Sequence, residues 1–231
     1  MELRSFALLT FDCYGTLIDW EAGILAAMRP ILAAHGVSIE DNRLLEIYAS
    51  LESEAEAGEY RPYRSILSEV VAGFGRRLGF EPSEGERRAL AASVASWPAF
   101  PDTVAALGAL KERFKLAIVS NVDTDLFAGT ARHLGVAFDH VITAGEVGAY
   151  KPAEAMFRAV LEQSGLPRER ILHVAQSLYH DIVPARKLGV ATVWVNRRSG
   201  RAGAGATPPA EATPDLEVPD LRSLVAHFTP G

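Results

Sequence analysis

Cysteine is almost absent from this sequence, which has one, Cys13, among 231 residues. An internal disulfide therefore cannot form, and the composition favours a reducing compartment. Long apolar runs are missing too, since no stretch reaches the roughly 20 residues of a transmembrane helix. The amino terminus, MELRSFALLTFDC, lacks the long apolar segment and small-residue cleavage site of a signal peptide. We expect a soluble cytoplasmic protein with no membrane partner.

An excess of positive charge is also missing. The chain has 23 Lys and Arg residues against 29 Asp and Glu residues, a formal net charge of −6. This balance argues against nucleic acid or an anionic membrane as the main partner. It does not exclude an anionic substrate, because a few cations can dominate one pocket. The remaining composition, 48% hydrophobic and 23% charged, is typical of a globular protein with a sizeable core.

Apolar segments alternate with amphipathic ones along most of the chain. The expected strands are residues 6–11, 115–121, 140–144, 171–177 and 191–196. The helices expected between them are residues 102–113, 125–134, 153–164 and 181–188. This alternation predicts an α/β fold with a Rossmann-like, doubly wound parallel sheet.

Residues 20–97 break the alternation, because they carry helix signals only. Ser83 and Glu86 have the spacing of a capping box at the start of one of these helices. The sequence thus predicts a helical cap domain over residues 20–97. It is inserted into a Rossmann-like core domain made of residues 1–19 and 98–231.

Three local features complete this prediction. Pro30 should kink or restart the first cap helix. The segment 198–214 is rich in Gly, Ala and Pro, and we interpret it as a flexible surface loop. Arg197 and Arg198, which overlap the start of that segment, are interpreted as a solvated strand end.

Polar residues follow four of the expected strands, at the edge where open parallel sheets bind ligands. Asp12 ends the first strand, Ser120 and Asn121 end the second, Lys151 follows the third, and Asp181 follows the fourth. We expect these side chains to meet at one site.

The segments FDCYGTLID, VSN, GAYKP and HVAQSLYHD resemble the four motifs of the haloacid dehalogenase superfamily, in the same order. The resemblance covers nearly the whole chain, including a helical cap after the first motif. It implies a hydrolase with Asp12 as nucleophile and Lys151 as the central cation.

Tyr14 stands where phosphatases of this superfamily place a second aspartate, the general acid beside a magnesium site. Gln176 likewise replaces an acidic residue of the fourth motif. A phenol with a pKa of about 10 is a poor ligand for Mg²⁺, which prefers carboxylates. DxYGT resembles the 2-haloacid dehalogenase branch, which works without metal. The resemblance therefore implies no metal and no cofactor.

In that branch an aspartate displaces halide from the carbon beside the substrate carboxylate. Water then hydrolyses the resulting ester to a 2-hydroxy acid. The catalytic residues implied here are Asp12, Thr16, Lys151 and Asp181, with Thr16 fixing the angle of the Asp12 carboxylate. The implied substrate-binding residues are Cys13 and Tyr14, through their backbone N–H groups, with Ser120, Asn121, Gln176 and Ser177. The implied partner is a small carboxylate substrate, and a homodimer is compatible with the resemblance.

Alternatives to a dehalogenase stay open. The branch carries a halide-facing arginine on its cap, yet the matching stretch EIYASLESE has none. Arg61 and Arg64 are candidates to replace it. The chain also resembles azetidine-2-carboxylate hydrolases, which open a strained C–N ring with a similar nucleophile. A superfamily phosphatase and a catalytically silent protein that binds a small acid are the remaining alternatives.

Overall fold

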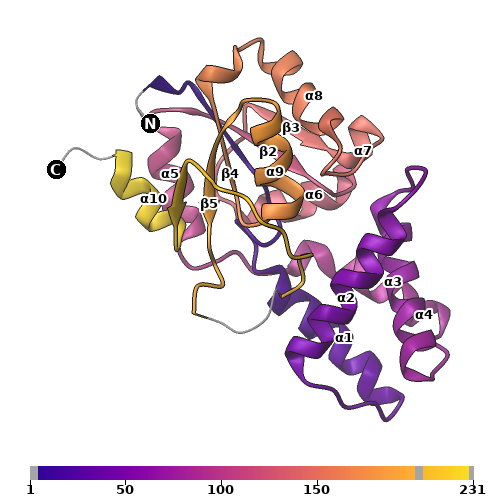
Figure 1. Cartoon of the computed structure of the whole chain (residues 1–231). Coiled ribbons are helices and arrows are strands. Elements are labelled where there is room, and N and C mark those ends of the chain that lie inside the picture. Colours follow the sequence, from indigo (N-terminus) through magenta and orange to yellow (C-terminus); the bar gives the residue numbers. More distant parts are fainter. Residues whose placement is uncertain (1–4, 201–204, 229–231) are drawn as a thin grey trace.

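A parallel sheet of six strands forms the centre of one lobe of the protein (Figure 1). The structure, a computed structural model, describes residues 5–200 and 205–228. The strands are β1 (Leu8–Phe11), β2 (Lys115–Ser120), β3 (His140–Thr143), β4 (Ile171–Ala175), β5 (Ala191–Val195) and β6 (Leu216–Val218). Their order is β3-β2-β1-β4-β5-β6, and every pairing is parallel. The predicted α/β fold with a doubly wound sheet is confirmed, and β6 is an edge strand that was not predicted.

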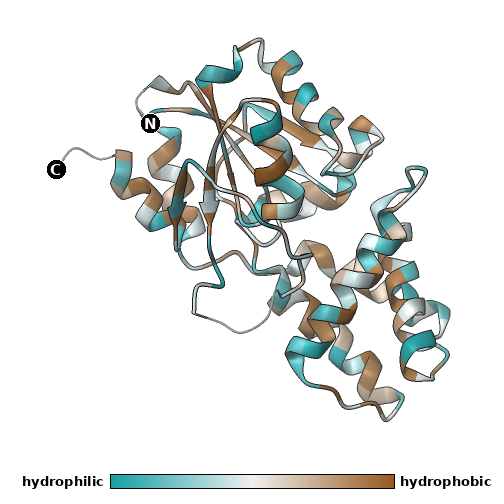
Figure 2. Cartoon of the chain, viewed as in Figure 1, coloured by the Kyte–Doolittle hydropathy of each residue, from teal (hydrophilic) through white to brown (hydrophobic). Residues whose placement is uncertain are grey.

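The central strands are apolar and buried on both faces, as expected for a parallel sheet covered by helices. All four residues of β1, LLTF, are buried. In the register of the sheet, Phe11 of β1 lies beside Ile118 of β2 and Val174 of β4. This alignment brings the carboxyl ends of the three strands to one edge. Figure 2 shows the matching pattern, with brown strands inside and teal residues on the outer helix surfaces.

In the described part of the chain, six α-helices surround the sheet. They are α5 (Thr103–Lys111), α6 (Thr124–Thr130), α7 (Ala144–Val147), α8 (Glu154–Ser164), α9 (Val183–Lys187) and α10 (Leu221–Phe228). Figure 1 shows α5 and α10 on one side of the sheet and α8 and α9 on the other. The helix predicted over 181–188 begins earlier than expected, as a π-helical turn over Leu178–Ile182 that leads into α9.

Four α-helices follow β1 and precede α5, and Figure 1 shows them as a second lobe beside the sheet. They are α1 (Trp20–Ala34), α2 (Asp41–Glu56), α3 (Tyr63–Leu78) and α4 (Glu84–Ser93). The Ser83–Glu86 capping box is present at the start of α4. We keep residues 20–97 as the proposed bounds of a cap domain.

Pro30 does not restart the first of these helices, because α1 continues through it to Ala34. A proline inside a helix removes one N–H donor and leaves the carbonyl four residues earlier without its partner. Here both Pro30 and Ala26 are exposed, so water can bond to that carbonyl. The prediction of a restart was therefore wrong.

The chain after β5 is held more firmly than predicted. Residues 205–207 are buried, so the interpretation as a surface loop is wrong there, while 201–204 lie outside the described residues. Arg197 pairs with Asp102 at 2.8 Å and Arg198 pairs with Glu21 at 2.5 Å. All four side chains are largely buried. The solvated strand end was thus also a wrong interpretation, because both guanidinium groups tie this segment to the rest of the fold.

Among residues 5–200 and 205–228, none of the helices combines the length and the apolar character that a bilayer span requires.

Candidate active site

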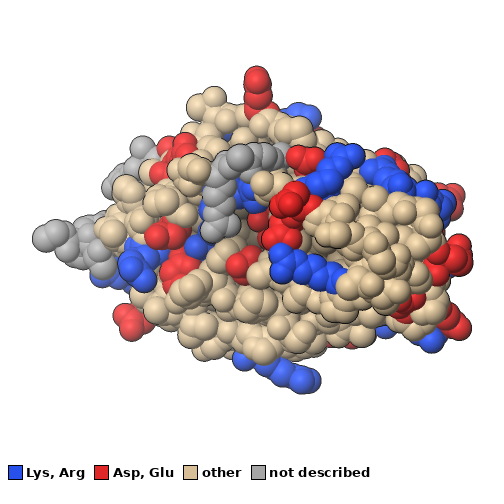
Figure 3. Space-filling model, turned by 90° about the horizontal axis from the view of Figure 1, so that it is seen from below, with Lys and Arg blue, Asp and Glu red and all other residues tan. Residues whose placement is uncertain are grey.

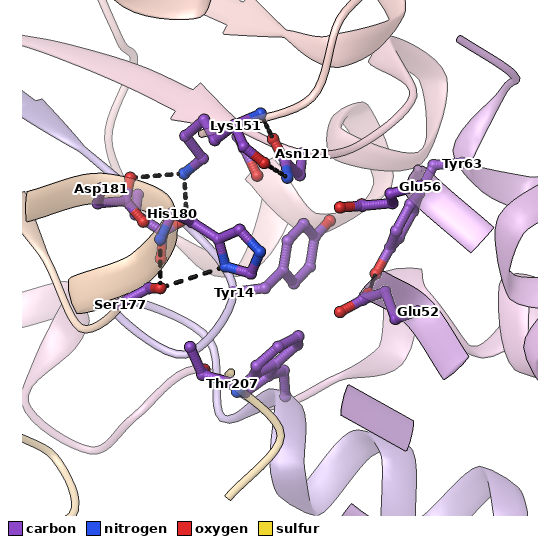
Figure 4. A pocket seen from close by; sticks show the side chains of 13 residues that line it. Tyr14, Glu52, Glu56, Tyr63, Asn121, Lys151, Ser177, His180, Asp181 and Thr207 are labelled. Carbon is purple, nitrogen blue, oxygen red and sulfur yellow. Dashed lines mark hydrogen bonds and ion pairs between the residues drawn. The ribbon is translucent and has the colours of Figure 1, made fainter. Parts of the chain in front are cut away.

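The carboxyl edge of the sheet and the helices of the second lobe enclose a pocket (Figure 4). Its volume is about 400 Å³ including the mouth, which is at the small end for a ligand site. The core residues that line it are Asp12, Tyr14, Ser120, Asn121, Lys151, Ser177, His180, Asp181 and Thr207. The inserted helices contribute Trp20, Glu52, Glu56 and Tyr63. Most of the predicted site residues therefore meet in one place.

A lysine buried between two aspartates forms the centre of the site. Nζ of Lys151 donates to Oδ1 of Asp12 at 2.8 Å and to Oδ1 of Asp181 at 2.7 Å. It also donates to the backbone carbonyl of Val119 at 2.8 Å. The side chain of Lys151 is only 1% exposed, so all three of its donors are used inside the protein. Buried charges persist only when they are paired and hydrogen-bonded in this way.

The ionisation states of these three groups depend on one another. Burial raises the pKa of Asp12, and the charge of Lys151 offsets part of that rise. Burial acts on Asp181 in the same direction, yet Lys151 and His173 bring the pKa of Asp181 below its ordinary value. Desolvation would lower the pKa of Lys151, but the two carboxylates outweigh it and raise that pKa. Lys151 thus stays charged, and it is the group that favours the ionised form of Asp12.

Thr16 contacts the Asp12 carboxylate, and its predicted role in fixing the angle of that carboxylate stays a prediction. Its Oγ1 donates to Oδ2 of Asp12 at 2.7 Å and accepts the backbone N–H of Gln176 at 2.9 Å. The Gln176 side chain lies outside the pocket lining, and its Oε1 accepts the hydroxyl of Thr207 at 3.3 Å. The Cys13 side chain is fully buried in the core. The substrate-binding roles of Gln176 and of the Cys13 backbone stay predictions.

Two polar side chains at the end of β2 have different surroundings. Oγ of Ser120 is buried and has no hydrogen-bond partner in the described part of the chain. A buried polar group without a partner is costly, so Ser120 is well placed to bind a ligand oxygen. The Asn121 amide instead donates to the Lys151 carbonyl at 3.0 Å and accepts the Lys151 N–H at 2.7 Å. Asn121 therefore holds the lysine loop, and its predicted contact with the leaving group stays a prediction.

His173 belongs to the same network, and it was not singled out in the sequence analysis. Its Nε2 lies 2.9 Å from Oδ1 of Asp181, and its Nδ1 lies 2.8 Å from Oγ1 of Thr10. Thr10 and His173 are direct partners in the register of β1 and β4. A histidine inside the apolar strand ILHVA, beside a threonine in the neighbouring strand, was the signal that could have revealed this link.

The fourth-motif segment contributes two further pocket residues. Oγ of Ser177 accepts the backbone N–H of His180 at 2.9 Å and lies 3.2 Å from the ring Nδ1 of His180. Burial lowers the pKa of His180 to about 4. The imidazole is therefore neutral at pH 7 and adds no positive charge to the pocket.

The donor set of the pocket does not fit magnesium. The Tyr14 hydroxyl shares a hydrogen bond of 2.8 Å with Oγ1 of Thr130, and its ring packs edge-on against Trp97. Burial raises the pKa of Tyr14 well above its usual value, so it remains a neutral phenol. Mg²⁺ needs several hard oxygen ligands around one point. Within residues 5–200 and 205–228 no cluster of three or more acidic, His or Cys side chains has a metal-binding arrangement.

Known proteins resemble this chain in sequence and in fold. A protein-family model described as haloacid dehalogenase-like hydrolase matches residues 6–189. The chain belongs to the haloacid dehalogenase-like hydrolases. A relative of this hydrolase, (S)-2-haloacid dehalogenase H-109 of Pseudomonas putida, is 30% identical over 222 residues, which cover 94% of the chain and 95% of the relative.

Two other proteins resemble this hydrolase over nearly their full length. Haloacetate dehalogenase H-2 of Moraxella sp. (strain B) is 27% identical, covering 96% of the chain and 98% of the relative. The crystal structure of the L-2-haloacid dehalogenase PA0810 has a TM-score of 0.80 at 23% identity, covering 96% and 98% of the two chains. The predicted resemblance to the superfamily and to its 2-haloacid dehalogenase branch is confirmed.

Proposed function

We propose that this hydrolase is a metal-independent enzyme in which the Asp12 carboxylate attacks a saturated carbon of a small carboxylate substrate. The reaction that we favour converts a 2-haloalkanoic acid to a 2-hydroxy acid and halide. The observation that carries this proposal is the placement of Lys151 between Asp12 and Asp181 at the pocket, with a neutral Tyr14 in place of an acid. The names of the relatives, 2-haloacid and haloacetate dehalogenases, support it.

The chemistry follows from groups already described. An oxygen of Asp12 forms a bond to the substrate carbon while the carbon–halide bond breaks, and the electron pair leaves with the halide. The Ser120 hydroxyl and the backbone N–H groups of Cys13 and Tyr14 bind the substrate carboxylate. Water then attacks the carbonyl carbon of the Asp12 ester. Oδ2 of Asp181 has no hydrogen-bond partner in the described part of the chain, so it is available to accept a proton from that water.

A second candidate, hydrolytic opening of a C–N ring, is favoured by the cap side of the pocket. Glu52 and Glu56 line it, and no arginine of the described residues does. Arg61 donates to the carbonyl of Ala55, and Arg64 pairs with carboxylates outside the pocket. Neither Arg61 nor Arg64 is therefore placed to bind the leaving halide. Ring opening of azetidine-2-carboxylate releases no halide and needs no such cation.

The test is a substrate screen in the presence of a chelator. We expect purified protein with EDTA either to release halide from 2-haloacids or to open azetidine-2-carboxylate, at the same rate as without EDTA. The reason is that Tyr14 and Gln176 replace the acidic partners of a magnesium site. Ion chromatography and amino-acid analysis measure the products, and Asp12→Asn, which removes the nucleophile at nearly constant volume, is the inactive control.

A different result would overturn the proposal. If EDTA removed most of the activity, if magnesium restored it, and if phosphate esters were the compounds turned over, the enzyme would be a phosphatase. Binding of a small acid without turnover of any compound would instead indicate a silent binding protein.

A further inference from the structure

The wall of the pocket that faces the nucleophile from the inserted helices is acidic. Glu52 and Glu56 lie one helical turn apart on α2, and both line the pocket. Figure 4 shows their carboxyl groups pointing toward Tyr14 and the core side of the site. In Figure 3, red Asp and Glu atoms likewise border a hollow near the centre of the face shown.

Glu52 is held in place by two tyrosines. Its Oε1 accepts the hydroxyl of Tyr48 at 2.7 Å and the hydroxyl of Tyr63 at 2.6 Å. The two hydroxyl oxygens lie 3.1 Å apart, and Trp20 packs edge-on against Tyr48. Both tyrosine donors go to Oε1, so Oε2 is left as an acceptor on the pocket side. Because Glu52 is only 5% exposed, this carboxyl is a fixed part of the pocket wall.

Glu56 adds a second acceptor without a partner. Its carboxyl is half-buried and accepts no hydrogen bond from residues 5–200 or 205–228. Lys151 is the only Lys or Arg in the described pocket lining, and its three donors are already used. The cap wall therefore has carboxyl oxygens that no Lys or Arg of residues 5–200 and 205–228 neutralises. A substrate with negative charge alone would add repulsion to this wall.

The opposite wall has the reverse character. Ser120 is 1% exposed, and its hydroxyl has no partner in the described part of the chain. The backbone N–H groups of Cys13 and Tyr14 follow the carboxyl end of β1, next to the end of β2 that carries Ser120. One side of the pocket thus presents donors for a carboxylate, and the other side presents fixed acceptors. A ligand that carries an anion and a cation a few bonds apart complements both walls.

We propose that the substrate of this hydrolase is a small zwitterionic acid, with an ammonium group that Glu52 and Glu56 bind through its N–H donors. This inference rests on the proposed function, because Asp12 must still be the nucleophile. Two sources share this chemistry: a halogenated amino acid, and an amino acid whose nitrogen lies in a strained ring. On this proposal the two glutamates recognise an ammonium group on the side of the pocket where the 2-haloacid dehalogenase branch carries its halide-facing arginine.

The first test is binding to the inactive Asp12→Asn protein, measured by calorimetry with two matched pairs of compounds. One pair is 3-amino-2-chloropropanoate and 2-chloropropanoate, which differ only in the ammonium group. The other is azetidine-2-carboxylate and cyclobutanecarboxylate, in which CH₂ replaces the ring nitrogen. We expect the ammonium member of at least one pair to bind about tenfold tighter or more. The pair that shows the preference identifies the source.

The control variants separate recognition from folding. Glu52→Gln and Glu56→Gln, each in the Asp12→Asn background, should remove most of the preference for the ammonium compound. Glu56 has no hydrogen bond to lose, so its variant tests recognition even if Glu52→Gln disturbs the tyrosine pair. Glu46→Gln is the matched control, because Glu46 is exposed on the same helix and pairs only with Arg43. It should keep the full preference.

The pH dependence gives a second, independent readout. Burial raises the pKa of Glu52 to about 7, although its hydrogen bonds from Tyr63 and Tyr48 act against that rise. A carboxyl group is ionised above its pKa, so affinity for the ammonium compound should increase as the pH rises through 7. Affinity for the matched compound without the ammonium group should fall over the same range, and Glu52→Gln should make both profiles less steep.

Other titratable groups face Glu52 from each packed element, and none of them reverses this sign. Tyr48 and Tyr63 stay neutral, because burial raises the pKa of each phenol well above its usual value. The pKa of Tyr150 is likewise raised by burial, and Lys151 remains charged. Glu56 changes with Glu52 in the same direction, since burial and the neighbouring Glu52 raise its pKa.

The outcomes distinguish this inference from the proposed function. One outcome is equal affinity within both pairs together with halide release from 2-chloropropanoate by the wild-type protein. It would overturn the inference of a zwitterionic substrate and leave the proposed dehalogenase function intact. A preference for the ammonium compound that persists in both Glu52→Gln and Glu56→Gln would also overturn the inference of a zwitterionic substrate. Preferred binding of an ammonium compound without turnover of any compound would uphold the recognition and overturn the hydrolase mechanism.

Discussion

Lys151→Ala should lower kcat at least about 100-fold. The side chain of Lys151 neutralises Asp12 and Asp181 together, and both are nearly inaccessible to water. Without the ammonium group the two carboxylates repel each other, and burial raises the pKa of Asp12 further, so that the nucleophile becomes protonated. Breaking a buried ion pair also costs about 3–5 kcal/mol of stability. Steady-state kinetics and urea unfolding measure the two effects separately.

Two controls sharpen this experiment. Lys151→Arg should restore little activity, because a planar guanidinium cannot place one nitrogen between both aspartates and the Val119 carbonyl. Lys187→Ala removes an exposed lysine at the end of α9 and should leave kcat unchanged. A Lys151→Ala enzyme with nearly wild-type turnover would show that the buried cation is structural.

Oxygen from Asp12 should appear in the first product molecule. If Asp12 attacks carbon, the product hydroxyl comes from its side chain, and solvent oxygen enters when the ester is hydrolysed at the Asp12 carbonyl. With enzyme in large excess over substrate, in heavy-oxygen water, each site turns over at most once. The product should then be unlabelled, and the label should lie in the peptide that contains Asp12. Mass spectrometry of product and peptide reads both from one sample.

Direct attack by water on the substrate gives the opposite distribution of label. Asp12 would then act as a general base, the first product would carry heavy oxygen, and the Asp12 peptide would not. That result would rule out the covalent ester. A mutation of Asp12 does not distinguish these two mechanisms, because under either one turnover is lost when the carboxylate is removed.

The site residues that could be predicted from the sequence are those whose position follows from the local pattern of strands and helices. Asp12 and Ser120 stand at the ends of apolar strands, and parallel strands bring such ends to one edge. The contact between His173 and Asp181 does not follow from a strand end, because His173 lies inside β4, and its place in an apolar strand beside Thr10 was the available signal. The short β6 strand also escaped prediction, since three residues carry too little periodicity to be recognised.

Long-range contacts account for the other differences. Tyr48 and Glu52 are four residues apart, so their position on one face of α2 was predictable. Their contact with Tyr63 depends on how α2 packs against α3, which no local pattern reveals. Arg197 looked solvated because its partner Asp102 lies 95 positions away in the chain. Pairs of opposite charge that become buried together cannot be recognised from either segment alone.

The two walls of the pocket are held by separate sets of hydrogen bonds, and this affects how the substrate specificity of such an enzyme can evolve. The hydrogen bonds that hold Glu52 come from Tyr48 and Tyr63, and neither tyrosine bonds to Lys151. On our proposal, substitutions in α2 and α3 change which molecule is accepted while the nucleophile keeps its geometry. New specificities can then evolve in small steps, because a variant that admits a different acid still has a working Asp12 with which to be selected.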